Sequence, residues 1–174
     1  TKSGNFYTGN LSESKNVIHI PTGQIQQDVQ RTATAALNSG TSPETRVEYG
    51  GHVLFGDTNA RIWDAGTTMQ TQILSDGSTE KKWSVKPFKI GGKNNQFGGL
   101  ISQIQFFWHI HPNGSTPSRG DIWWVGELRK YGFTGNSFLI DINNNRVIFF
   151  NEKGSLMNIK YDDFKRMGKQ EDIK

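Results

Sequence analysis

Four residues of the short segment WHIHPNGSTPSRGD have types and spacing that suit metal binding: His109, His111, Ser118 and Asp121. The two histidines end an apolar run, 104–111, that predicts a β-strand, and side chains two residues apart on a strand project from the same face. Two imidazoles placed in this way can share one ion. The Pro and Gly residues that follow predict a turn, after which an amphipathic helix is predicted, with Asp121 in its first turn.

A carboxylate at that point can turn back over the strand end and act as a third ligand. Three protein ligands leave a fourth tetrahedral position for water, which is the arrangement of a catalytic rather than a structural zinc site. Zinc suits imidazole and carboxylate ligands, although manganese, iron and nickel can use the same set. The chain has no cysteine, so Cys-rich structural zinc sites are excluded. The plain alternative is two strand-end histidines, one bonded to the loop and one facing solvent.

These residues resemble the signature of the JAB/MPN metallopeptidases, in which a distant glutamate precedes His-x-His-Pro, a loop and Ser-x-x-Asp. The segment RVEYGGHVLFG, which contains Glu48, resembles the family's early strand with its catalytic glutamate. The likeness is detailed there and over residues 106–121, and looser elsewhere. Two departures bear on substrate specificity more than on the metal site. Ile110 replaces a small polar residue, and the loop from His111 to Ser118 is about one residue shorter, a change that a glycine-containing turn absorbs easily.

The resemblance implies a zinc-dependent metallopeptidase or isopeptidase that hydrolyses an amide bond. His109, His111 and Asp121 would hold Zn²⁺, which lowers the pKa of its bound water. Glu48 would be the base that takes a proton from this water and passes it to the leaving amine. Ser118 would donate a hydrogen bond to the oxyanion of the tetrahedral intermediate. Its competing role is that of N-cap for the helix that follows.

Glu48 is followed closely by two glycines, which sets it apart from nearby polar residues. Gly50 and Gly51 lack side chains, which would allow another backbone or a substrate to approach closely. The nearest rival acid, Glu44, falls in a predicted turn and is expected to be exposed. His52 shares the face of Glu48 if the strand is regular, and we expect it to lie near the site rather than in it.

Length and composition predict one globular domain over residues 1–174, with residues 1–15 as a flexible arm. A chain of 174 residues can bury a core without disulfides, and the mean hydropathy of −0.62 is typical of a folded domain with a polar surface. The apolar runs fall far below the length of a membrane span, so no membrane partner is expected. No signal-peptide pattern is visible, and a start at Thr1 suits a piece of a longer polypeptide.

The charge pattern does not predict a nucleic-acid partner. The formal net charge is +4, but the basic residues are scattered rather than gathered with aromatic residues on one face. The aromatic clusters 106–108 and 123–124 are instead predicted to be core that flanks the site.

Hydrophobic periodicity predicts an α+β fold, a mixed sheet flanked by helices, which is also the JAB/MPN (cytidine deaminase-like) architecture that the resemblance implies. A glycine-rich insertion, 91–99, is interpreted as a surface loop, with a substrate gate as the alternative. Besides the Glu48 and His109 strands and the helix after Ser118, the expected elements are a helix at 22–38, strands at 60–63 and 69–74, a turn at 75–78 with a return strand at 82–90, a hairpin of 138–142 with 146–150, a strand at 156–160 and a helix from 161.

Two main classes of function follow from the resemblance. The first is the zinc metallopeptidase, whose substrate would be a protein or peptide; a ubiquitin-like conjugate, the parent polypeptide and a cell-wall peptide all fit the same metal centre. The second is a catalytically silent JAB/MPN-like scaffold for a partner protein, against which the complete ligand set argues. Deaminase chemistry is a third class, but its signatures need cysteine ligands. The polar arm and compact unit also resemble JAB-like domains that end bacterial polymorphic toxins, which implies secretion and an immunity protein as partner.

Overall fold

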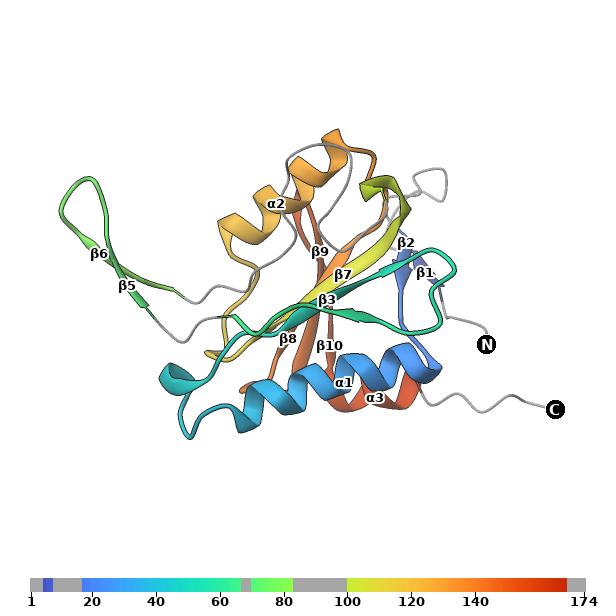
Figure 1. Cartoon of the computed structure of the whole chain (residues 1–174), viewed down its shortest axis with the longest axis horizontal. Helices are drawn as coiled ribbons and strands as arrows, with labels where there is room; N and C mark the ends of the chain where they lie inside the picture. Colours follow the sequence, from blue (N-terminus) through green and yellow to red (C-terminus); the bar gives the residue numbers. More distant parts are fainter. Residues whose placement is uncertain (1–4, 8–16, 67–69, 83–99, 169–174) are drawn as a thin grey trace.

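The computed structural model describes residues 5–7, 17–66, 70–82 and 100–168. Its centre is a six-stranded mixed sheet with the strand order β10-β9-β8-β7-β3-β4 (Figure 1). Strands β7 and β8 pair in parallel, and the other neighbours are antiparallel. The strands of this sheet are β3 (Gly50–Leu54), β4 (Arg61–Ile62), β7 (Ile104–His111), β8 (Ser137–Asp141), β9 (Arg146–Asn151) and β10 (Gly154–Lys160). The predicted α+β class with a mixed sheet is confirmed.

Helices cover both faces of this sheet. Helices α1 (Gly23–Asn38) and α3 (Tyr161–Met167) lie on one face, and α2 (Arg119–Lys130) lies on the other (Figure 1). Short 3₁₀ helices occupy Pro43–Thr45 and Ile101–Gln103. Within the described ranges, no helix has the length and apolar character needed to cross a membrane.

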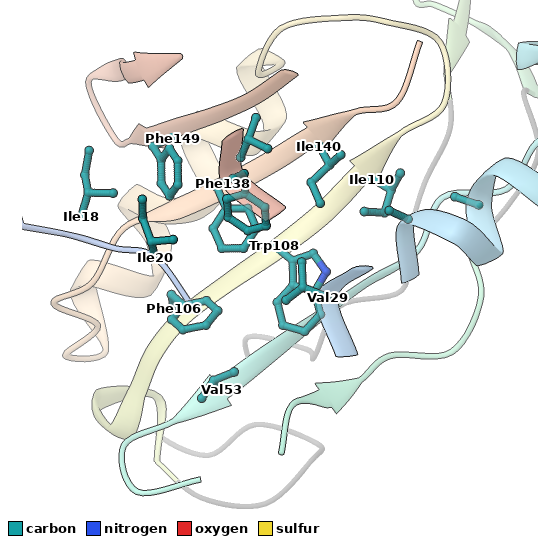
Figure 2. Packing of buried hydrophobic residues seen from close by; sticks show 14 residues of the cluster. Ile18, Ile20, Val29, Val53, Phe106, Trp108, Ile110, Phe138, Ile140 and Phe149 are labelled. Carbon is teal, nitrogen blue, oxygen red and sulfur yellow. The ribbon is translucent and has the colours of Figure 1, made fainter. Parts of the chain in front are cut away.

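Strand β7 divides its side chains between the two faces. Phe106, Trp108 and Ile110 pack into the core under α1 and α3, and Figure 2 shows this cluster around Trp108. The Trp108 indole Nε1 donates to Thr32 Oγ1 of α1 at 3.0 Å. Because side chains alternate along a strand, residues 107, 109 and 111 face the α2 side. The alternation that builds the core therefore also directs both histidines toward α2.

The two glycines of β3, Gly50 and Gly51, allow other groups to approach the strand closely, as predicted. The groups that do so belong to the protein itself. A Cβ on Gly51 would lie 2.4 Å from Trp108 Cη2, and one on Gly50 would lie 2.8 Å from Trp63 Cε3. Each of these Cβ atoms would also lie 2.6 Å from a backbone oxygen, that of Trp108 for Gly50 and that of Arg61 for Gly51. Indole rings and neighbouring backbone thus fill the space that the missing side chains leave.

The predicted element boundaries agree with the structure at most positions. Strand β7 has the predicted bounds, and α1 begins and ends within one residue of its expected range. Strand β5 (Gln70–Ile73) pairs with β6 (Thr79–Lys82), so the return strand starts three residues before its predicted start at 82. Residues 83–90 of that predicted strand, and the predicted loop 91–99, lie outside the described residues.

A two-stranded sheet precedes α1. Strand β1 (Asn5–Tyr7), within the predicted N-terminal arm, pairs antiparallel with β2 (Val17–His19). The rest of the predicted arm lies outside the described residues. The expected N-terminal strand around His19 is therefore present.

The prediction that both Trp123 and Trp124 belong to the core is wrong. Trp123 is 58% exposed, whereas Trp124 packs against the core under α2. At about 100° per residue, Trp123 points away from both Val125 and Leu128, whereas Trp124 lies nearly in line with Leu128. The buried face of α2 is set by Val125 and Leu128. Leu37, expected on the apolar face of α1, is 46% exposed near the C-terminal end of that helix.

Candidate metal centre

Three of the predicted site residues converge between β7 and α2. The Nε2 atoms of His109 and His111 are 2.8 Å apart. Asp121 Oδ1 lies 3.2 Å from His109 Nε2, and its Oδ2 lies 3.4 Å from His111 Nε2. His109, His111 and Asp121 offer ligand atoms that all lie within 4.8 Å of one another. The structure therefore brings together the three residues that the spacing singled out.

The donor set and its dimensions fit a small divalent cation. Zinc–nitrogen bonds of about 2.0–2.1 Å at tetrahedral angles place neighbouring ligand atoms about 3.3 Å apart. The two histidine–carboxylate separations have this size, and the histidine pair is somewhat closer. Both histidine side chains are about 6% exposed and that of Asp121 is 21% exposed, so the cluster is accessible from the carboxylate side.

Asp121 is held as a carboxylate. Burial raises its pKa, but the adjacent imidazoles, His109 more than His111, lower it by more, so the pKa lies well below the usual range. Its position in the first turn of α2 also favours a negative charge, because the helix dipole is positive there. An ionised carboxylate oxygen is a suitable ligand for a hard or borderline cation.

Ser118 is the N-cap of α2. Its Oγ accepts from the Asp121 backbone N–H at 3.1 Å, while its own backbone N–H donates to Asp121 Oδ2 at 2.7 Å, which completes a capping box. The competing role foreseen for Ser118 is therefore present. Accepting a hydrogen bond does not use the hydroxyl hydrogen, which can still be donated.

Glu48 precedes β3 by two residues instead of lying inside a strand, and it is buried at 8% exposure. Gly50 pairs with His109, so the same register places Glu48 opposite His111. The Ile110 N–H donates to Tyr49 O at 2.8 Å, which makes the two flanking pairs the narrow, non-hydrogen-bonded kind. Residues paired in this way carry their side chains on the same face. Glu48 thus extends from the histidine side of the sheet.

The backbone at Glu48 is anchored on its other side as well. Glu48 O accepts from the Gly66 N–H at 2.8 Å, and Gly50 O accepts from the Trp63 N–H at 3.0 Å. These bonds continue the β3–β4 pairing beyond the short β4 strand. Glu48 itself is not among the three grouped ligands.

Glu44 and His52 are not among the grouped ligands. Glu44 is exposed in the 3₁₀ helix Pro43–Thr45. His52 is fully buried and pairs with Phe107, and its Nδ1 accepts from the Trp63 indole Nε1 at 2.9 Å. Burial and the Arg61 charge lower the pKa of His52 to about 4, against a smaller opposite effect of Asp57, which keeps the imidazole neutral near pH 7.

Sequence reasoning missed the residues that support the histidine loop. His111 Nδ1 lies 2.8 Å from Ser115 Oγ and 3.2 Å from Ser115 O. The β8–β9 turn holds the same loop, because Asn143 Nδ2 donates to Pro112 O at 2.8 Å. The only sequence signal was a polar residue four positions after His111, which is too common to select.

No protein-family model, curated protein or solved structure matches this chain.

Proposed function

We propose that this protein is a zinc-dependent hydrolase of the JAB/MPN type that cleaves an amide bond in a protein or peptide. The observation that carries the proposal is the convergence of His109, His111 and Asp121, with Glu48 opposite His111 on the same face of the sheet. A metal centre alone would fit many roles. A buried acid on the same face of the sheet, outside the ligand group, is a candidate for the base that hydrolysis needs.

Each residue has one task in this proposal. The two imidazoles and the Asp121 carboxylate hold the ion, which when bound acts as a Lewis acid that makes water nucleophilic at neutral pH. Glu48 takes the proton of the attacking water and delivers it to the departing amine nitrogen. Ser118 uses its remaining hydroxyl hydrogen to stabilise the negative charge that develops on the carbonyl oxygen. A JAB/MPN identity is part of the proposal, and the mixed sheet flanked by helices is compatible with it.

The metal content of the purified protein tests the centre. Protein prepared without added metal is analysed for zinc in the wild type, His109→Ala, Asp121→Ala and the control His19→Ala. We expect close to one zinc per chain in the wild type and the control, and a loss of zinc in the two ligand variants. A wild type that takes up no zinc even when it is supplied, or ligand variants that retain it, would refute the metal centre.

Glu48→Gln separates catalysis from metal binding. The amide cannot accept the proton, so peptide or isopeptide hydrolysis should fall by about 10²–10⁴-fold, while zinc content and unfolding midpoint stay unchanged. Glu44→Gln makes the same chemical change four residues away on an exposed residue and should leave hydrolysis intact. Equal activity of Glu48→Gln and the wild type would exclude Glu48 as the base. The assay screens mixed peptides and lysine-linked conjugates with the zinc-loaded chain.

A further inference from the structure

We propose that Ser115 is a positioning residue that fixes the tautomer of His111, so that this imidazole presents an unprotonated Nε2 to the metal. The inference deepens the proposed function and rests on its metal centre. It concerns how the site is assembled, and it assigns a task to a loop residue that makes no contact with the ion in this scheme.

The hydrogen bonds around Ser115 determine which ring nitrogen carries the hydrogen. The Ser115 Oγ donates its single hydrogen to Asn113 Oδ1 at 3.0 Å. At 2.8 Å from His111 Nδ1, the same Oγ must therefore accept. The Ser115 carbonyl oxygen, 3.2 Å from the same Nδ1, can only accept. Both partners thus require a hydrogen on Nδ1, which in the neutral imidazole leaves a lone pair on Nε2.

That lone pair points into the proposed centre. His111 Nε2 is the atom that lies 2.8 Å from His109 Nε2 and 3.4 Å from Asp121 Oδ2. A histidine can bind a metal through a nitrogen only when that nitrogen is unprotonated, and the hydrogen bond of the other nitrogen selects the tautomer. Ser115 acts on the side of the ring away from the ion.

The loop that carries Ser115 is itself held in place. Gly114 has a φ of +79°, in the left-handed region, and a Cβ there would lie 2.7 Å from Asn144 Nδ2. Asn144 Nδ2 donates to Gly114 O at 3.2 Å, and Asn143 Nδ2 donates to Pro112 O at 2.8 Å. The β8–β9 turn therefore fixes the loop on both sides of Asn113, so Ser115 is presented to His111 by the fold.

The tautomer can be read directly by NMR. Long-range ¹H–¹⁵N correlation spectra of the ¹⁵N-histidine-labelled full chain, recorded at pH 8 after chelator treatment and again with one equivalent of zinc, identify the protonated nitrogen of each ring. We expect a hydrogen on Nδ1 of His111 in both samples. A hydrogen on Nε2 of His111 in the chelator-treated protein would overturn the proposal.

Three variants then test whether the Ser115 hydroxyl is responsible. We expect Ser115→Ala to weaken zinc binding about 10-fold in a competition titration with a chromogenic chelator, as is typical for loss of a group that orients a metal ligand. Ser115→Thr keeps the hydroxyl and should restore the affinity. Thr116→Ala removes the neighbouring, exposed hydroxyl and should change nothing. An unchanged affinity in Ser115→Ala, or an equal loss in Thr116→Ala, would overturn the proposal.

Failure of this inference can be told apart from failure of the proposed function. If the wild type does not bind zinc, the metal centre fails, and the chelator-treated spectrum still decides whether Ser115 fixes the ring. If zinc binds but Ser115→Ala has no effect, only the positioning role fails. A loss of hydrolysis in Glu48→Gln tests the base and does not depend on the Ser115 result.

Discussion

The histidines differ in what their ring nitrogens face, and this difference gives them different chemistry. His109 and His111 turn their Nε2 atoms toward each other and toward a carboxylate. His52 lies fully buried between β3 and the Trp63 indole, where its neutral Nδ1 accepts a hydrogen bond. The same side chain therefore suits a metal centre in one place and a neutral core contact in the other.

His52 makes stability depend on pH. Its pKa is about 4 in the folded protein and 6.5 as its ordinary value, so the unfolded chain binds more protons in between, and stability is lost as the pH falls through this range. The free energy of unfolding should drop by about 2 kcal/mol between pH 7 and pH 4.5 from this group alone. His52→Gln retains an acceptor for Trp63 and should lack this component. Urea titrations of both proteins at the two pH values measure it, and parallel pH dependences would contradict the assignment.

The strand and the helix on either side of the site carry its candidate ligands at their ends. Strand β7 delivers the histidines at its last residues, and α2 delivers Asp121 in its first turn. Between them lies a loop held by the turn of another hairpin. Because the capping box uses both Ser118 and Asp121, the start of the helix and the third ligand are determined together.

The N-cap role and the proposed catalytic role of Ser118 can be separated with two variants. Alanine cannot cap the helix and should cost about 1 kcal/mol of stability, whereas glycine at an N-cap costs only a few tenths. Both variants lack the hydroxyl, so both should lose hydrolysis to a similar extent if it stabilises the oxyanion. Thermal unfolding and hydrolysis rates measured side by side distinguish the roles. Activity that follows stability, with glycine close to wild type, would reduce Ser118 to a helix cap.

At the scale of the whole molecule, the sheet separates two cores with different surroundings. The core under α1 and α3 contains Phe164, which is fully buried and packs 5.5 Å from Phe138, ring centre to ring centre. On the opposite side, α2 buries Val125 and Leu128 but leaves Trp123 exposed. The site lies on the α2 side, so the aromatic core on the other face supports it without contributing to its chemistry.

Two aromatic truncations should report this asymmetry. Phe164→Ala opens a cavity where α3 meets the sheet and should lower the free energy of unfolding by about 3–5 kcal/mol. Trp123→Ala removes a larger side chain from the surface and should cost less than about 1 kcal/mol. Urea denaturation followed by circular dichroism measures both. A comparable loss in the two variants would mean that Trp123 belongs to a packed region.

The local pattern of the sequence was sufficient for much of the fold and for part of the site. The apolar run placed β7 at its observed bounds, and the Ser118–Asp121 spacing placed the start of α2, because both signals depend on residues only a few positions apart. These two elements also carry the three grouped ligands. The same local pattern was insufficient for Trp123, where adjacent aromatic residues point in different directions around the helix.

Only the tertiary structure decided the contacts between distant segments. The β3–β7 register places Glu48 opposite His111, and the β8–β9 turn reaches across to the histidine loop through Asn143. Such pairings depend on how strands align and on which face each element buries, and many alignments are compatible with the same local pattern. The sequence by itself therefore determined the candidate ligands and the elements that carry them, while the tertiary structure placed the candidate base and the supporting residues around them.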